Sequence, residues 1–269
     1  MKIEINPEYE HLRPEIEKIF NQIYILKDWG EVMYATPRLL PENAEYIYRG
    51  GRNDLYRLPI GGRNFIVKDF KTPHIINRYV YTTLRKSKAS RSYSNAMKML
   101  GLGFKTPKPV AYIEFKKWGR LRYSFYISED LTGAEEMRQW EEKPNAEELL
   151  RAFAMEINRL HKAGVLHLDF SPGNILFIRN EDGSYDFHYV DLNRMKFGVY
   201  SRKRLMRMFR AINLKRAETE RIARLYAEAA GLDADKTAAE AIGELEGYFA
   251  EQKKKKKFKN LKNSFLDRL

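Results

Sequence analysis

The sequence predicts an α+β protein with two lobes, the first rich in strands and the second mainly helical. Two observations indicate this division. Short apolar runs between Gly- and Asn-containing turns fill residues 45–128, whereas all ten prolines lie at or before Pro172 and the charge-rich remainder has helical spacing. We expect the lobes to meet near residues 128–131, so the predicted domains are residues 1–128 and 129–269.

The first lobe is expected to be a small antiparallel sheet with one main helix. A helix is predicted near residues 7–20, and a second one over 93–100, where apolar residues recur three and four positions apart. Gly and Asn at 50–53 and 61–64 permit the positive φ angles of tight turns, and Trp118-Gly119 forms a third turn. The predicted strands are residues 46–48, 55–58, 65–68, 110–115 and 121–128.

The second lobe begins with a helix and continues into a short loop of unusual composition. Asn145 with Glu148 three residues later is a capping-box-like start, and Gly164 ends the helix. The loop HLDFSPGNIL comes next, and then a hairpin over residues 175–190 that ends at Asp191. Helices are expected in the remainder, so the HLDFSPGNIL loop would be held between elements of regular structure.

Composition restricts the partners more than it restricts the fold. The chain has no cysteine and a formal net charge of +13, which excludes thiolate chemistry and favours acidic partners: nucleic acid, an anionic membrane surface, or a phosphorylated or carboxylated substrate. No nucleic-acid-binding motif stands out, so no nucleic acid is expected. The acidic first ten residues make a poor signal peptide and no apolar run reaches membrane-spanning length. We therefore expect a cytoplasmic protein.

The segment from His167 to Asn174 has the spacing H-x-D-x-x-x-x-N between a helix and a hairpin. Phosphoryl transfer needs a carboxylate to orient the attacking hydroxyl, and oxygen ligands for Mg²⁺. Asp169 fits the first role, and Asn174 with Asp191 fits the second. Lys68, on the third predicted strand, would neutralise the α- and β-phosphates of ATP. His167 is expected to brace the loop rather than to act as a base.

Several stretches together resemble one family. They are VKDF around Lys68, RSYSNAMKML, TPKPVAYIE, YISEDL, HLDFSPGNILF and YVDLNRMKF. The chain resembles the protein-kinase-like superfamily, and within it the Kdo/heptose lipopolysaccharide kinase family. This implies a protein-kinase-like fold that uses ATP and Mg²⁺. It also implies Asp169 and Lys68 as catalytic residues, Asn174 and Asp191 as metal ligands, and backbone groups of Glu129, Asp130 and Leu131 at the adenine.

Two departures from the kinase pattern are visible. No Asp or Glu occurs between Phe70 and Ile113, so the helix after Lys68 lacks the glutamate that usually pairs with this lysine. We expect either that another carboxylate, with Asp191 as the candidate, orients Lys68, or that the lysine is held loosely until ATP binds. The glycine-rich phosphate loop is reduced to Gly50, Gly51 and Arg52, whose backbone N–H groups can still cradle phosphate. These departures keep a non-catalytic pseudokinase scaffold open as an alternative.

The residues after Asp191 indicate the class of acceptor. No A-P-E segment occurs there, which disfavours a protein substrate. From Arg194 to Arg216 there are nine basic and no acidic residues. The helix predicted over 202–212 either packs with a solvated basic face or binds an anionic glycolipid or sugar acceptor through Arg207 and Arg210, with Ser171 also a candidate contact. A small-molecule kinase of the aminoglycoside or choline type is the alternative.

The C-terminal region mixes basic and apolar residues. Lys253–Lys257 is followed by apolar side chains among residues 258–266. Such a run is either a solvated tail or a contact with an anionic membrane surface. The second interpretation predicts peripheral attachment to the cytoplasmic face of an inner membrane.

Overall fold

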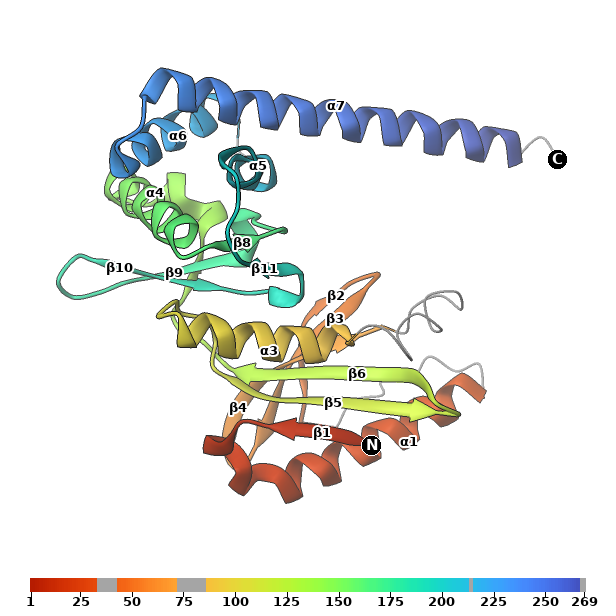
Figure 1. The fold of residues 1–269 in the computed structure, drawn as a ribbon. Coiled ribbons are helices and arrows are strands. Elements are labelled where there is room, and N and C mark those ends of the chain that lie inside the picture. The colour runs from red at the N-terminus through yellow and green to blue at the C-terminus, as the bar shows by residue number, and fades with distance from the viewer. Residues whose placement is uncertain (33–42, 72–85, 213–214, 267–269) are drawn as a thin grey trace. The chain divides into compact units, whose positions relative to one another are not determined.

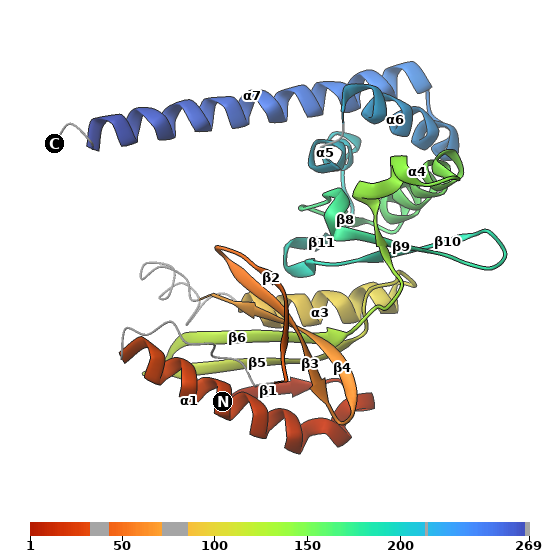
Figure 2. The ribbon, with the colours of Figure 1, turned by 180° about the vertical axis from the view of Figure 1, so that it is seen from behind.

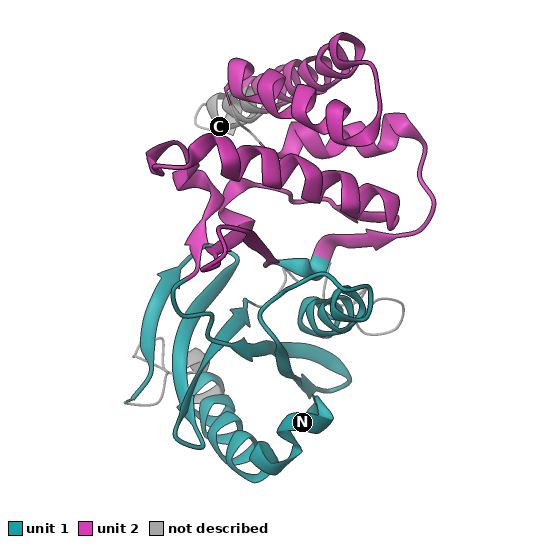
Figure 3. Ribbon diagram, turned by 90° about the vertical axis from the view of Figure 1, so that its left-hand side faces the viewer, with its two compact units in different colours: residues 1–133, 191–193 teal, residues 134–190, 194–269 magenta. Residues whose placement is uncertain are grey.

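The structure, a computed structural model, describes residues 1–32, 43–71, 86–212 and 215–266. The chain divides into two compact units (Figure 3): residues 1–133 with 191–193, and residues 134–190 with 194–269. The short segment Asp191–Asn193 therefore belongs to the first unit, although the chain on both sides of it belongs to the second.

The first unit contains a six-stranded sheet in the order β1-β5-β6-β4-β3-β2, in which every neighbouring pair is antiparallel. The prediction of five strands missed β1, which pairs with β5 and places Ile3 opposite Ile113. Four residues with a single alternation are too short to stand out as a strand. The strands are β1 (Lys2–Ile5), β2 (Glu45–Arg49), β3 (Asn53–Ile60), β4 (Arg63–Phe70), β5 (Pro109–Lys117) and β6 (Arg120–Glu129).

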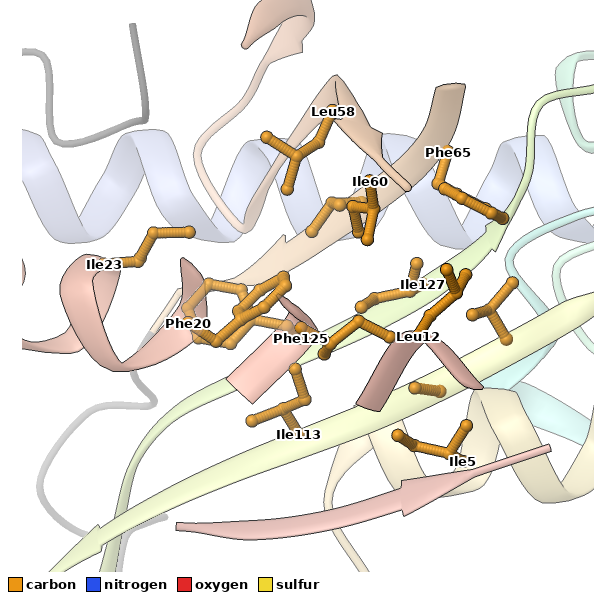
Figure 4. Packing of buried hydrophobic residues seen from close by; sticks show 14 of the residues in the cluster. Ile5, Leu12, Phe20, Ile23, Leu58, Ile60, Phe65, Ile113, Phe125 and Ile127 are labelled. Carbon is orange, nitrogen blue, oxygen red and sulfur yellow. The ribbon is translucent and has the colours of Figure 1, made fainter. Parts of the chain in front are cut away.

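One face of this sheet is covered by the N-terminal helices (Figures 1 and 2). The helix predicted over 7–20 is a 3-10 helix η1 (Pro7–Leu12) followed by a longer α-helix, α1 (Arg13–Val32). Its residues Ile16, Phe20 and Ile23 are fully buried in the main apolar cluster of the unit (Figure 4). Burying each such side chain contributes about 1.5–3 kcal/mol, so α1 is an integral part of the lobe.

The opposite face carries helix α3 (Lys88–Gly101), whose first turn is capped by the Ser87 hydroxyl. Consecutive strand residues separate to the two faces, as the two-residue period of a strand requires. On β5, Ile113 joins the cluster beneath α1, whereas Tyr112 packs with Tyr93 of α3. The predicted second helix is thereby confirmed.

Strand β4 carries Lys68 and Asp69 side by side, so their side chains point to opposite faces. Asp69 forms an ion pair with Lys27 of α1, and the two side chains are only 4% and 16% exposed. Burial raises the pKa of the Asp69 carboxyl, while the neighbouring ammonium of Lys27 acts in the opposite direction. This buried ion pair fastens α1 to the strand that bears Lys68.

The second unit combines two small sheets with helices. The sheets have the strand orders β10-β9-β7 and β11-β8, all antiparallel. Their strands are β7 (Glu135–Glu136), β8 (Val165–His167), β9 (Ile175–Arg179), β10 (Tyr185–Tyr189) and β11 (Met195–Phe197). The α-helices are α4 (Ala146–Lys162), α5 (Arg202–Ile212), α6 (Arg216–Ala230) and α7 (Ala234–Leu266); the 3-10 helices are η2 (Met137–Glu142), η3 (Pro172–Asn174) and η4 (Leu192–Arg194), the last beginning in the segment counted with the first unit.

The core of the helical part lies between α4, α5 and α6. His161 of α4 is buried, with Nδ1 3.0 Å from the Tyr226 hydroxyl of α6 and Nε2 3.1 Å from the sulfur of Met208 on α5. Burial lowers the pKa of His161 to about 4. Among the described helices, none is both long and apolar enough to cross a bilayer.

Candidate active site

The first unit brings together Lys68 and Asp191. The Lys68 Nζ lies 2.9 Å from Oδ1 of Asp191, and the two side chains are 15% and 25% exposed. The aromatic ring of Phe70 lies beneath the ammonium group, 5.6 Å from its centroid. The expectation that Asp191 orients Lys68 in place of a helix glutamate is therefore confirmed.

Helix α3 contributes to the site through hydrogen bonds to the segment that carries Asp191. The Asn95 side chain donates to the carbonyl oxygen of Leu192 at 2.7 Å, and the Arg91 guanidinium donates to that of Asn193 at 3.1 Å. The sequence analysis looked for a carboxylate on this helix and missed both residues. The only signal available was the polar character of these two positions within an otherwise amphipathic helix.

Asp191 itself adopts an unusual backbone conformation. Its φ angle is +55°, in the left-handed region that non-glycine residues rarely occupy, although Asp and Asn tolerate it better than most. The Asn193 side-chain amide donates to Asp191 Oδ1 at 2.5 Å, the same oxygen that Lys68 contacts. Such a conformation persists only where the surroundings enforce it, and the contacts from Lys68, Asn193 and α3 supply that enforcement.

The second unit holds the HLDFSPGN loop in a fixed shape. The backbone N–H of Asp169 donates to Nδ1 of His167 at 3.1 Å, so Nε2 must carry the ring proton and donate to the Val190 carbonyl, also at 3.1 Å. His167 is 1% exposed, and its predicted bracing role is confirmed. Phe170 is fully buried and stacks on Phe153 of α4 at 5.7 Å, which anchors the middle of the loop.

The same loop fixes the orientation of Asn174. Its amide Nδ2 donates to the Asp169 carbonyl at 2.8 Å, which leaves the amide oxygen as the acceptor of this side chain. The Val190 N–H donates to the Asn174 carbonyl at 3.0 Å, which ties this loop to the residue directly before Asp191. A carboxamide oxygen and a carboxylate are the hard oxygen donors that Mg²⁺ prefers. Asn174 in the second unit and Asp191 in the first thus each carry a donor group of the kind that suits Mg²⁺.

Asp169 has one cationic neighbour that sequence reasoning did not single out. Its carboxylate is 43% exposed and lies 3.5 Å from the guanidinium of Arg194. The loop itself contains no Lys or Arg, so this cation comes from the segment after Asp191. In the sequence, Arg194 stands out only as one of nine basic residues. Ser171, a predicted acceptor contact, is half-buried and donates its N–H to the Asp169 carbonyl at 2.8 Å.

Of the residues expected at the adenine, Glu129 and Asp130 already use their side chains in hydrogen bonds within the first unit. The Glu129 carboxylate accepts from the hydroxyl of Tyr9 at 2.6 Å and from Arg63 at 2.9 Å, and the Asp130 carboxylate accepts from Arg57 at 2.6 Å. Burial, with Glu129 as hydrogen-bond partner, raises the pKa of Tyr9 well above its ordinary value. The Glu129 N–H already donates to the carbonyl of Lys108 at 2.9 Å. Any adenine contact must therefore use other backbone groups of this segment.

The two glycine turns of the first unit differ in backbone conformation. Glycine permits positive φ at both turns, but positive φ occurs at Gly61 and Gly62 and not at Gly50 or Gly51. The Gly50 N–H donates to the Asn53 carbonyl at 3.1 Å and lies 3.2 Å from Oδ1 of Asp54. Local hydrogen bonds thus close the turn and make positive φ unnecessary. Arg52 is exposed at its tip.

The predicted amphipathic helix is present as α5, and its two candidate arginines differ. Arg207 is exposed, whereas Arg210 lies 2.8 Å from the Glu251 carboxylate and 3.7 Å from that of Glu244, both on α7. The buried residues of α5 are Met206, Met208, Phe209 and Ile212. The helix therefore packs through its apolar side, and Arg210 serves at least in part to hold α7.

Comparison with known proteins gives a consistent result. The sequence model of the lipopolysaccharide kinase (Kdo/WaaP) family matches residues 49–226. A 3-deoxy-D-manno-octulosonic acid kinase from Vibrio parahaemolyticus serotype O3:K6 (strain RIMD 2210633) is 24% identical over 136 residues, which cover 50% of this chain and 56% of that relative. The matched region thus spans little more than half the length of the curated relative.

Among solved structures, WaaP in complex with acyl carrier protein superposes with a TM-score of 0.56 at 16% identity, covering 94% of this chain and 99% of that one. This similarity shows that the two chains share a protein-kinase-like fold. A weaker likeness, with a TM-score of 0.47 at 17% identity, is to the Rio2 kinase from Chaetomium thermophilum, covering 78% of this chain and 72% of that one. Because the family model extends over about two thirds of the sequence, from the end of β2 through the HLDFSPGN loop to α6, the chain belongs to the lipopolysaccharide kinase (Kdo/WaaP) family.

Proposed function

We propose that this protein transfers the γ-phosphate of ATP to a sugar hydroxyl of a lipopolysaccharide core or Kdo glycolipid. The observation that carries the proposal is the HLDFSPGN loop, in which a partly exposed Asp169 is held by the hydrogen bond that its N–H donates to His167 and by the one that its carbonyl accepts from Asn174. Family membership supports the reaction class, since the loop lies within the matched region. The Lys68–Asp191 ion pair supplies the charges expected at the nucleotide.

In the proposed reaction, the sugar hydroxyl oxygen bonds to the γ-phosphorus while the bond from that phosphorus to the β–γ bridging oxygen breaks. Asp169 orients the hydroxyl and accepts its proton. Lys68 binds the α- and β-phosphates, and backbone groups around Gly51, Arg52 and Leu131 hold the rest of the nucleotide. Asn174 and Asp191 would hold Mg²⁺, which neutralises phosphate charge when bound.

An anionic acceptor is favoured by the basic character of the protein. The net charge is +13, and Arg194 stands beside the carboxylate that would face the hydroxyl. Planar guanidinium groups bind carboxylate and phosphate well. We assign Arg207, which is exposed on α5, to the acceptor before Arg210, since Arg210 is already paired with Glu244 and Glu251.

A glycolipid acceptor implies work at a membrane, and we propose peripheral attachment on the cytoplasmic face of an inner membrane. The described lysines of the run, Lys253–Lys255 and Lys257, are exposed on α7, while the side chains of residues 258–266 lie outside the described part. Each lysine near an anionic surface contributes about 1 kcal/mol. Sedimentation with liposomes, with and without anionic lipid, tests this attachment, and a lack of lipid dependence would exclude it.

The reaction is tested by following labelled γ-phosphate from ATP into a panel of lipopolysaccharide precursors, with Asp169→Ala as the inactive control. We expect one glycolipid to be phosphorylated by the wild type and none by the variant. Turnover of an aminoglycoside, choline or a soluble sugar instead would indicate a small-molecule kinase. Nucleotide binding without transfer to any acceptor would indicate a pseudokinase scaffold and overturn the proposal.

A further inference from the structure

Strands β5 and β6 form a hairpin whose turn carries a tryptophan with little packing against the rest of the protein. Trp118 is 90% exposed, and with Gly119 it makes the two-residue connection between Lys117 and Arg120, which lie directly opposite each other. Both connecting residues have positive φ, +51° for Trp118 and +72° for Gly119. This is the φ signature of a type I′ turn, for which Asn-Gly is the preferred sequence.

The residues at this tip are poor choices for folding alone. A bulky residue with positive φ is a genuine conformational outlier, and Asn at position 118 would form the same turn more readily. Like charges directly opposite each other in an antiparallel pair are destabilising, yet Lys117 faces Arg120. Residues kept at a cost in stability mark functional sites, so the tip is better explained by a binding role.

The chemistry of the tip combines one large aromatic group with several cations. Lys116 and Arg120 are exposed, Lys117 and Arg122 are half-buried, and no acidic residue occurs between Glu114 and Glu129. The Lys117 ammonium lies 5.6 Å from the centroid of the Trp118 ring. Tryptophan is the side chain enriched at the membrane–water boundary, and basic residues are attracted to anionic lipid headgroups.

Helix α1 adds apolar surface at the same end of the sheet. Tyr24 stacks on Phe115 of β5 with ring centroids 4.6 Å apart, and the two residues after it, Ile25 and Leu26, are 53% and 45% exposed. Both ribbon views show the last turns of α1 at the end of the sheet where β5 and β6 connect (Figures 1 and 2). Exposed apolar side chains at this end of the sheet therefore come from both the β5–β6 tip and helix α1.

We propose that the β5–β6 tip is a membrane contact, in which Trp118 enters the headgroup boundary of an anionic bilayer and the cations at positions 116–122 bind lipid phosphates. The choice of a bilayer rests on the proposed function, because a glycolipid acceptor resides in one. This contact lies in the first unit and is independent of the α7 lysines. It would hold the nucleotide-binding lobe at the lipid surface.

The test uses the full-length chain and vesicles of phosphatidylcholine with or without phosphatidylglycerol. Trp118→Asn keeps the turn and removes the aromatic ring, and we expect it to weaken partition about tenfold to a hundredfold, as burial of about half a tryptophan surface implies. Lys116→Gln with Arg120→Gln should weaken partition about fivefold per charge. Lipids brominated in their acyl chains should quench wild-type fluorescence, and that quenching should be lost in Trp118→Asn.

Matched controls separate this site from general surface effects. Val199→Asn removes another fully exposed apolar side chain, and Lys236→Gln another exposed cation; neither should change partition. The melting temperature of Trp118→Asn should equal or exceed that of the wild type, because Asn suits the turn. A lower melting temperature, unchanged partition of Trp118→Asn, or partition that depends on the α7 lysines alone would overturn the proposal.

The proposed function fails or holds separately from this contact. Asp169→Ala should bind vesicles like the wild type even though it transfers no phosphate. Vesicle binding through Trp118 without any glycolipid turnover would leave the contact intact and overturn the proposed glycolipid acceptor. If this protein bound another protein or a nucleic acid through the tip and had no affinity for anionic vesicles, the membrane contact would be overturned instead.

Discussion

Stability at acid pH should depend on His161, and the size of the effect can be worked out from its burial. The imidazole is held neutral between the Tyr226 hydroxyl and the Met208 sulfur, and its pKa falls from the ordinary value of 6.5 to about 4. The unfolded chain binds a proton below pH 6.5, whereas the folded chain does so only below about pH 4. Stability is thus fully present above pH 6.5 and is lost as the pH falls toward 4.

A pKa difference of this size corresponds to about 3 kcal/mol in total, of which about 2 kcal/mol is lost between pH 7 and pH 5. Urea unfolding followed by tryptophan fluorescence at pH 7, 6 and 5 measures this loss. His161→Phe keeps a ring in the core and removes the titration. Between pH 7 and pH 5 its free energy of unfolding should therefore fall by about 2 kcal/mol less than that of the wild type. The exposed Lys236 provides the control, because lysine side chains do not titrate between pH 5 and pH 7 and Lys236→Gln should therefore retain the wild-type slope.

A constant loss of stability in His161→Phe, arising from the changed contact with Tyr226, cancels in this comparison because only the slope is used. If His161→Phe and the wild type lose stability in parallel between pH 7 and pH 5, the imidazole is not buried in its neutral form. The assigned packing of α4 against α5 and α6 would then be wrong.

Three further outcomes concern the site. Asp191→Asn tolerates the left-handed backbone but lacks the charge, so kcat should fall at least a hundredfold with little change in melting temperature; near-normal kcat would contradict the metal-ligand role. Asn95→Ala loses one hydrogen bond, worth about 1 kcal/mol, and should lower kcat/KM for ATP about fivefold. The neighbouring change Ser94→Ala should leave kcat/KM unchanged. Equal effects of the two changes would refute the anchoring of the Asp191 segment by α3. Arg194→Gln and Arg207→Glu should each raise the acceptor KM about tenfold and spare the ATP KM, and unchanged acceptor KM would remove these arginines from the acceptor site.

Local spacing made much of the site predictable. His167, Asp169 and Asn174 lie within eight consecutive residues, so the hydrogen bonds that fix the loop are dictated by short-range geometry. The absence of acids between Phe70 and Ile113 showed that a carboxylate partner for Lys68 had to come from outside this stretch, and Asp191 was the candidate that the structure bears out. In these cases a short stretch, or the absence of one residue type from it, carries the information.

The missed features depend on partners distant in sequence. Asn95 and Arg91 bind backbone carbonyls about a hundred residues away, and no side-chain pattern marks which carbonyls will be presented to them. Strand β1 exists because β5 offers it an open edge, which its four residues do not encode by themselves. Arg194 meets Asp169 only through the folding of the second unit.

The pairing of Lys27 with Asp69 has a practical consequence for shortened versions of this protein. A fragment beginning after α1 would leave the Asp69 carboxylate in an apolar face with its cation gone. Leaving one partner of a buried pair without the other costs about 3–5 kcal/mol, a large share of what a domain has in total. Trimming to the family-matched region, which starts at residue 49, would therefore destabilise the strand that carries Lys68.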